Sequence, residues 1–167
     1  MMGRMFPYPS PDSSLLKEPV RITSEDGIGL INSILHDEVF DLGQIRFDEG
    51  AHIVTIPVRR RFHAGAEHLI RTGLLFKTYE KDWMRSVVTL RRVRSWEVLH
   101  DQGINSYSFN VWRLANGVLE VQCCESLLLR FEVDGLDVEI ADKGFEGKAR
   151  IKRGPMGIES STGRVYE

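Results

Sequence analysis

The chain of 167 residues is poor in several features that would point to particular classes of protein. No uninterrupted apolar run exceeds three residues, whereas a helix that crosses a bilayer needs about 20, so we expect no membrane span. The N-terminus also lacks an apolar stretch long enough for a signal peptide, and we therefore expect a cytoplasmic protein. With 42% hydrophobic and 28% charged residues, the composition is that of a folded globular chain.

Cysteine is scarce, and the two cysteines, Cys123 and Cys124, are adjacent. Neighbouring side chains of a strand point to opposite faces, so a disulfide between them would be strained. We expect two free thiols and a reducing compartment. Because this spacing matches no zinc or thioredoxin pattern, we expect neither a metal nor another cofactor.

The composition of the two ends differs from that of the middle. Three prolines, Pro7, Pro9 and Pro11, interrupt the N-terminal segment, and five glycines lie among the last 25 residues. These residues disfavour a regular hydrogen-bonded ladder. The sequence therefore predicts an extended N-terminal arm over 1–14, a single β-rich domain over 15–153 and an irregular C-terminal tail over 154–167.

A short helix is expected near the start of the domain. Ser24 and the acidic residues after it suit a helix N-terminus, and Ile28, Ile31 and Leu35 follow at helical spacing. These residues predict a helix over about 24–36. Gly27 and Gly29 each disfavour it by about 1 kcal/mol, so packing must stabilise it.

The rest of the domain alternates apolar and polar residues, as half-buried strands do. Hairpins are expected over 45–58 and over 104–123, where Asn116-Gly117 suits a tight turn. Alternation over 127–140 extends the second hairpin into an antiparallel meander. Single strands are expected over 69–79 and over 84–99, the latter with a bulge. The predicted fold is a mainly β, antiparallel roll or barrel of six to eight strands with one short N-terminal helix.

The charges are unevenly distributed along the chain. Residues 59–94 contain 10 basic and 3 acidic side chains, whereas residues 95–142 contain 2 and 9. The candidate anion-binding or partner-binding residues are the arginines of two clusters: Arg59, Arg61, Arg91, Arg92 and Arg94. Guanidinium groups bind carboxylates and phosphates through paired hydrogen bonds. The alternative is that these arginines pair with the acidic strands that contain Glu132, Asp137 and Glu139.

Two His-Asp pairs, His36-Asp37 and His100-Asp101, form an alternative pocket hypothesis. Imidazole and carboxylate can serve acid-base chemistry or bind a divalent cation. However, the sequence has no His-Glu-x-x-His motif, no nucleophile motif and no phosphate-binding glycine loop.

We therefore expect a non-enzymatic binding or protein-interaction module. Its partner would be another protein or a second copy of the chain, engaging an exposed strand edge or an aromatic patch beside the arginines. Two alternatives stay open: a small-ligand or metal-dependent enzyme with a pocket near the His-Asp pairs, and a nucleic-acid-binding domain.

Overall fold

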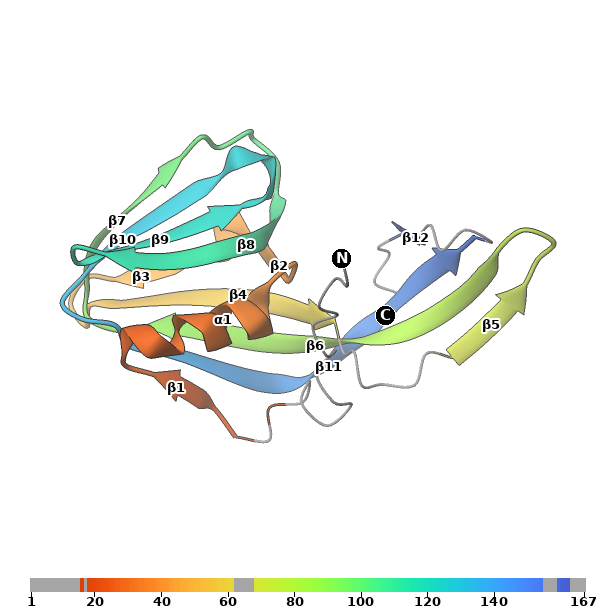
Figure 1. Cartoon of the computed structure of the whole chain (residues 1–167), viewed down its shortest axis with the longest axis horizontal. Coiled ribbons are helices and arrows are strands. Elements are labelled where there is room, and N and C mark those ends of the chain that lie inside the picture. Colours follow the sequence, from red (N-terminus) through yellow and green to blue (C-terminus); the bar gives the residue numbers. More distant parts are fainter. Residues whose placement is uncertain (1–15, 17, 62–67, 155–158, 163–167) are drawn as a thin grey trace, which may run out of the picture. The chain divides into compact units, whose positions relative to one another are not determined.

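Twelve strands and one α-helix form in the part of the chain that the computed structural model describes, residues 16, 18–61, 68–154 and 159–162 (Figure 1). The chain divides into two units. Unit 1 consists of Met1–Leu16, Arg61–Trp83 and Glu146–Glu167, and unit 2 consists of Lys17–Arg60 and Met84–Phe145. The expected arm over 1–14 lies outside the described residues, as does the expected tail apart from Gly154 and 159–162.

The helix α1 spans Ile28–Leu35 and follows a 3-10 turn at Glu25–Gly27, so the helix expected at about 24–36 is confirmed. No helix in the described ranges is long and apolar enough to cross a membrane. The strands are β1 (Val20–Ile22), β2 (Val39–Asp41), β3 (Arg46–Asp48), β4 (Ile53–Arg61), β5 (His68–Thr72), β6 (Lys77–Leu90), β7 (Val93–Leu99), β8 (Ser106–Ala115), β9 (Val118–Cys123), β10 (Leu128–Val133), β11 (Val138–Arg153) and β12 (Glu159–Thr162).

The hydrogen-bonded order of the strands is β1-β11-β6-β4-β2-β8-β9-β10-β7, with β3 on β4, β5 on β6 and β12 on β11. Each of these pairings for which the register is known is antiparallel. The prediction of a mainly antiparallel β fold with one N-terminal helix is therefore confirmed. The order ends at β1 and β7, so the sheet is not closed into a barrel. The 12 strands exceed the expected six to eight, because strands of three or four residues are too short to show alternation.

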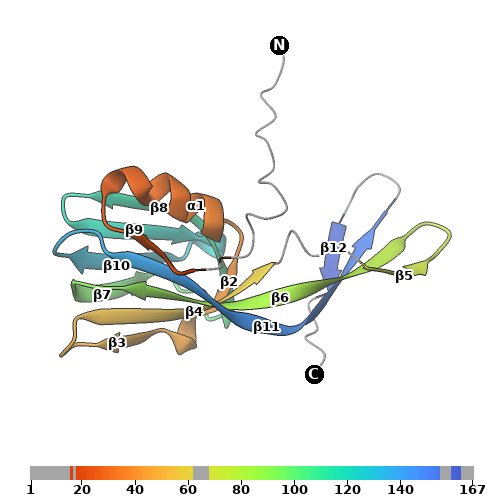
Figure 2. The same ribbon diagram turned by 90° about the horizontal axis from the view of Figure 1, so that it is seen from below.

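Unit 2 contains one apolar core between two layers of strands. Figures 1 and 2 show β8, β9, β10 and β7 in one layer, with β4, β6 and the first part of β11 in the other. The largest fully buried side chains include Trp112, Tyr107, Phe40, Phe109 and Phe131. Their alternation with exposed neighbours turns one face of each strand inward.

The helix α1 lies along β8 and is joined to it by one side chain. Asn32 donates a hydrogen bond from Nδ2 to the carbonyl of Trp112 at 3.1 Å and accepts one from the Trp112 amide at 2.8 Å. The Asn32 amide thus takes the place of a neighbouring strand for this peptide unit. The inward face of the helix buries Ile31 and Leu35 completely.

The two hairpins expected from turn residues are confirmed. β3 pairs with β4, and β8 pairs with β9 through the turn at Asn116 and Gly117. Both turn residues have positive φ, 52° and 74°, as the tightest hairpin turns require. β10 then pairs with β9 and completes a three-stranded meander.

Two expectations about the next turns are wrong. The expected single strand over 84–99 is divided into β6 and β7, because the chain turns at Arg91 and Arg92, where Arg92 has a φ of 60°. The expected meander also ends at β10, since β11 leaves the turn at Asp134 to pair with β6 and β1. Both turns are fixed by hydrogen bonds between segments distant in sequence, for which short-range alternation carries no signal.

A buried ion pair joins the three neighbouring strands β4, β6 and β11. Arg60 Nη1 lies 2.6 Å from Asp142 Oδ1, and the Ser86 hydroxyl donates to the same carboxylate oxygen, also at 2.6 Å. The side chains of Arg60 and Asp142 are only 6% and 4% exposed. A charge at this depth is tolerated because its counter-charge is in contact with it.

In unit 1, β5 and β6 form a hairpin in place of the single strand expected over 69–79. The turn is closed by a hydrogen bond from the Gly73 amide to the Phe76 carbonyl at 2.8 Å. β12 pairs with β11 and lies within the segment expected to be an irregular tail.

Gly117→Ala should lower the free energy of unfolding by about 1 kcal/mol or more, because alanine is strained at positive φ. Gly43→Ala is the matched control: Gly43 does not have positive φ, and an added Cβ would meet no atom within 4 Å. Urea unfolding of both variants measures the difference. Equal losses would contradict the assignment of the turn.

Asp142→Asn should lower the free energy of unfolding by about 3 kcal/mol or more, because it neutralises the buried carboxylate that contacts the Arg60 guanidinium. Asp134→Asn removes an exposed carboxylate that pairs with Arg94 and should cost less than about 1 kcal/mol. The double variant Arg60→Leu, Asp142→Leu should recover much of the stability that Asp142→Asn loses. If Asp142→Asn matched Asp134→Asn in urea unfolding, the buried pair would have no special role.

Candidate functional site

Three of the five candidate arginines lie together where the chain passes from β6 to β7. Arg91 and Arg92 form the connection, and Arg94 is the second residue of β7. The backbone here is held by two hydrogen bonds to the β10–β11 turn, from Arg91 N to Asp137 O at 2.9 Å and from Asp134 N to Arg92 O at 3.0 Å. The sequence therefore places the arginine side chains beside an acidic turn.

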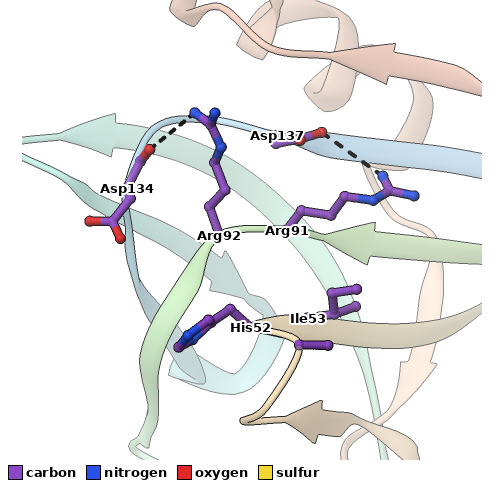
Figure 3. Close-up of a pocket in the computed structure, with 7 residues that line it drawn as sticks. His52, Ile53, Arg91, Arg92, Asp134 and Asp137 are labelled. Carbon is purple, nitrogen blue, oxygen red and sulfur yellow. Dashed lines mark hydrogen bonds and ion pairs between the residues drawn. The ribbon is translucent and has the colours of Figure 1, made fainter.

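A concavity of about 610 Å³ opens at this connection. It is lined by Ala51, His52, Ile53, Arg91, Arg92, Asp134 and Asp137, and Figure 3 labels six of these residues, which come from three segments of unit 2. The concavity combines guanidinium groups, carboxylates and an imidazole within one open hollow. Such a lining suits a polar or charged group of a ligand.

Asp137 is the electrostatic centre of this region and is largely buried. It accepts hydrogen bonds from Arg21 Nε at 2.9 Å and Nη2 at 2.8 Å, and Arg91 Nη1 lies 3.9 Å from it. The hydrogen bonds from Arg21 lower the pKa of the Asp137 carboxyl, and the charges of Arg21, Arg91 and Arg92 act in the same direction. Arg91 also contacts Glu139 at 3.5 Å. Arg91 therefore pairs with acidic residues of β11 and its preceding turn, as the alternative to a binding role expects.

Arg92 and Arg94 are held more loosely than Arg91. Arg92 is exposed, and its Nη1 donates to the backbone carbonyl of Asp134 at 3.3 Å. Arg94 lies 3.2 Å from the Asp134 carboxylate, but both side chains are more than half exposed. Exposed pairs of this kind contribute about 1 kcal/mol or less, so a ligand can replace them at little cost.

A second concavity, of about 480 Å³, adjoins β7. It is lined by Phe47 and Glu49 of the β3–β4 hairpin, by Arg94, Ser95 and Trp96 of β7, and by His52, which also lines the first concavity. The Trp96 ring stacks on buried Phe131 with ring centroids 5.9 Å apart. The two hollows therefore share His52, the first at the β6–β7 connection and the second beside the start of β7.

The residues His52, Phe47 and Trp96 were not among the candidates from sequence. His52 lies within the hairpin expected over 45–58, but it precedes β4 in the turn, with a φ of 56°. Its carbonyl accepts a hydrogen bond from the Val93 amide at 3.0 Å, and its Nδ1 lies 3.2 Å from the Val93 carbonyl. No pattern within the sequence indicates this contact between residues 41 positions apart.

The other two candidate arginines do not join this group. Arg59 lies six residues after Ile53 along β4, about 20 Å away at strand spacing. Its Nη2 pairs with Asp41 at 2.9 Å, and Ser106 contacts the same carboxylate. Arg61 is the last residue of β4, and its side chain lies outside the described part.

The two His-Asp pairs each have local contacts. His36 Nδ1 lies 3.1 Å from the Asp37 carboxylate, and both side chains are more than half exposed. Asp101 accepts hydrogen bonds from the Tyr107 hydroxyl at 2.5 Å and the Gly103 amide at 2.9 Å, and these bonds lower its pKa. His100 accepts a hydrogen bond at its backbone carbonyl from Gln102. Neither pair lines the two concavities at β7.

Metal ligation and thiol chemistry gain no support from the geometry. Within the described ranges, no three His, Cys, Asp or Glu residues are grouped so that they could hold a metal ion. Both cysteines are free, and burial raises the pKa of the Cys123 thiol to about 12. Cys124 Sγ accepts a hydrogen bond from the Ser108 amide at 3.2 Å. Cys123 is thus kept as an unreactive thiol at neutral pH.

Arg21→Ala should weaken the acid dependence of stability. Because the folded-state pKa of Asp137 lies below its unfolded value of about 3.9, the stabilisation is complete above that value and is lost as the pH falls through the folded-state pKa. The difference in urea midpoint between the native chain and Arg21→Ala should therefore shrink below about pH 4. Arg94→Ala, at an exposed pair, is the control; a difference independent of pH would contradict the role of Asp137.

Comparison with protein-family models, with curated proteins and with solved structures gave no match. Function must therefore be inferred from the chemistry of the surface itself. That surface is the adjoining pair of concavities at the start of β7, bordered by Arg92, Arg94, His52 and Trp96.

Proposed function

We propose that this chain is a non-enzymatic binding module that receives an extended, acidic segment of a protein partner along the edge of β7. The observation that supports the proposal is the concavity of about 480 Å³ beside this edge, where Arg94 and His52 lie next to the aromatic rings of Phe47 and Trp96. This combination offers both positive charge and apolar contact to one ligand.

Two strand edges border the concavity. In the described part of the chain, β7 pairs only with β10 and β3 pairs only with β4, so each has one side without a strand neighbour. Their backbone amides and carbonyls on that side are a template for a further strand. An extended partner segment supplies the missing hydrogen bonds without any change in the existing sheet.

The seam between the two edges is closed at one end by the hydrogen bond from Val93 N to His52 O. In this proposal the fold is a β roll with one open seam, and the partner segment occupies the open part. Its side chains would point alternately toward the Phe47 and Trp96 rings and toward solvent.

The arginines set the charge of the partner. Arg92 and Arg94 make only exposed contacts, and each guanidinium can bind a carboxylate through two parallel hydrogen bonds. Arg91 stays with Asp137 and Glu139 and supports the wall of the first concavity. An acidic partner segment therefore offers a counter-charge to Arg94 on β7 and to Arg92 just before it.

The nucleic-acid alternative has less support, because the four candidate arginines whose side chains are described do not form one continuous surface. Arg59 pairs with Asp41 at the far end of β4, and Arg91 is engaged by two carboxylates. The enzyme alternative has less support as well, because none of the four residues of the His-Asp pairs lines either concavity. Self-association through β7 remains as an outcome for the experiment to distinguish.

The test uses a library of eight-residue peptides in which Glu or Asp alternates with apolar residues, and the strongest binder is labelled with fluorescein. The double variant Arg92→Glu, Arg94→Glu should weaken its affinity about tenfold or more in fluorescence anisotropy, because attraction becomes repulsion. N-methylation of alternate peptide amides should weaken binding as well, since strand addition needs those donors.

Arg113→Glu is the matched control, because Arg113 is exposed on β8 away from the concavities. Its affinity should equal that of the native chain. The proposal is wrong if the library yields no binder, or if the double variant binds as tightly as the control. If the chain formed a homodimer that excluded the peptide, the proposal would be replaced by pairing between the β7 edges of two copies.

A further inference from the structure

The tip of the β5–β6 hairpin in unit 1 exposes three consecutive large apolar side chains. Leu74 is fully exposed, and Leu75 and Phe76 are 62% and 52% exposed. We call these three residues the apolar tip. Single exposed leucines are common on protein surfaces, but three adjacent ones at a turn form a contiguous patch.

The apolar tip is not required by the turn that contains it. The hydrogen bond from Gly73 N to Phe76 O encloses Leu74 and Leu75 as the two central residues. Such positions usually hold Asn, Gly or Asp, whose backbones adopt turn conformations easily. Leucine contributes nothing to the turn, so its apolar surface at this place requires another explanation.

The charges next to the apolar tip have one sign. From residue 68 to residue 79 the sequence contains Arg71 and Lys77 and no acidic residue. Both cations are exposed and lie on the two strands that lead into the tip. Apolar side chains beyond a pair of cations are the arrangement that suits a lipid surface with anionic headgroups.

We propose that the apolar tip inserts into the surface of an anionic lipid bilayer, with Arg71 and Lys77 at the level of the headgroups. Leu74, Leu75 and Phe76 enter the boundary between headgroups and acyl chains. The strands themselves stay outside the hydrocarbon, so their backbone hydrogen bonds are unaffected. This site is independent of the β7 edge.

A second copy of the chain is a less suitable occupant. A stable dimer buries about 800 Å² on each partner, and a tip of three side chains presents less than that. The apolar tip is also narrow, and a lipid bilayer can deform around it more easily than a flat protein surface can. Because three side chains and two cations are a small anchor, the binding should be weak and reversible.

The test measures sedimentation of the full-length chain with sucrose-loaded vesicles, of phosphatidylcholine alone or with 30% phosphatidylserine. The native chain should bind the anionic vesicles and bind the neutral ones several-fold less. Leu74→Ser, Leu75→Ser should reduce binding about tenfold or more, because it removes most of the apolar surface that would leave water. Since both leucines are exposed, the thermal midpoint should stay unchanged and confirm folding.

Two further variants separate the contribution of the cations to vesicle binding from that of exposed leucines in general. Arg71→Glu, Lys77→Glu should abolish the preference for anionic vesicles, and added salt should mimic that loss. Leu30→Ser alters an exposed leucine on α1 and should bind like the native chain. Equal sedimentation of native chain and tip variant would overturn the proposal. A concentration-dependent dimer that dissociates in the tip variant would assign the tip to self-association instead.

Discussion

The two-layered architecture of unit 2 depends on one corner, where two connections between strands are hydrogen-bonded to each other. The chain passes from β6 to β7 at Arg91 and Arg92, and from β10 to β11 at Asp134 to Asp137. Two backbone hydrogen bonds and the carboxylate of Asp137 hold these two connections together. Arg21 of β1 donates two hydrogen bonds to the same carboxylate. Without this corner β6 could continue straight into the residues of β7, and the second layer would lose its outer strand.

The same corner explains why the arginines divide into two kinds. Arg91 and Arg21 surround a largely buried carboxylate, so they are needed to compensate its charge. Arg92 and Arg94 point to the exposed side of the corner and make weaker contacts. A positive surface therefore arises next to a structural ion-pair network, and proximity in sequence does not separate the two roles.

Sequence reasoning succeeded where the determining interactions are local. Asn116-Gly117 identifies its turn, because both residues readily adopt positive φ, and α1 is indicated by the spacing of Ile31 and Leu35. It failed at Arg92, which has a positive φ where its carbonyl accepts a hydrogen bond from the distant Asp134 amide, and at Leu74-Leu75, whose apolar character resembles a buried strand. Within the candidate site, Arg92 and Arg94 could be proposed from charge, whereas His52 and Trp96 could not. Their relevance comes from strands that meet only in the folded chain.

Besides its backbone pairing with β10, the edge strand β7 has a cluster of charges on its exposed face. Arg130 of β10 contacts Glu97 of β7 at 2.9 Å and Glu120 of β9 at 3.2 Å. Since these groups are partly exposed, they hold β7 less firmly than the buried contacts hold β8 and β9. β7 should therefore belong to the part of unit 2 that opens locally at low free energy, while the central strands exchange their amide hydrogens only on global unfolding. An edge of this kind has a conformational freedom that ligand binding would reduce, so occupancy of the seam would be visible as slower hydrogen exchange along β7.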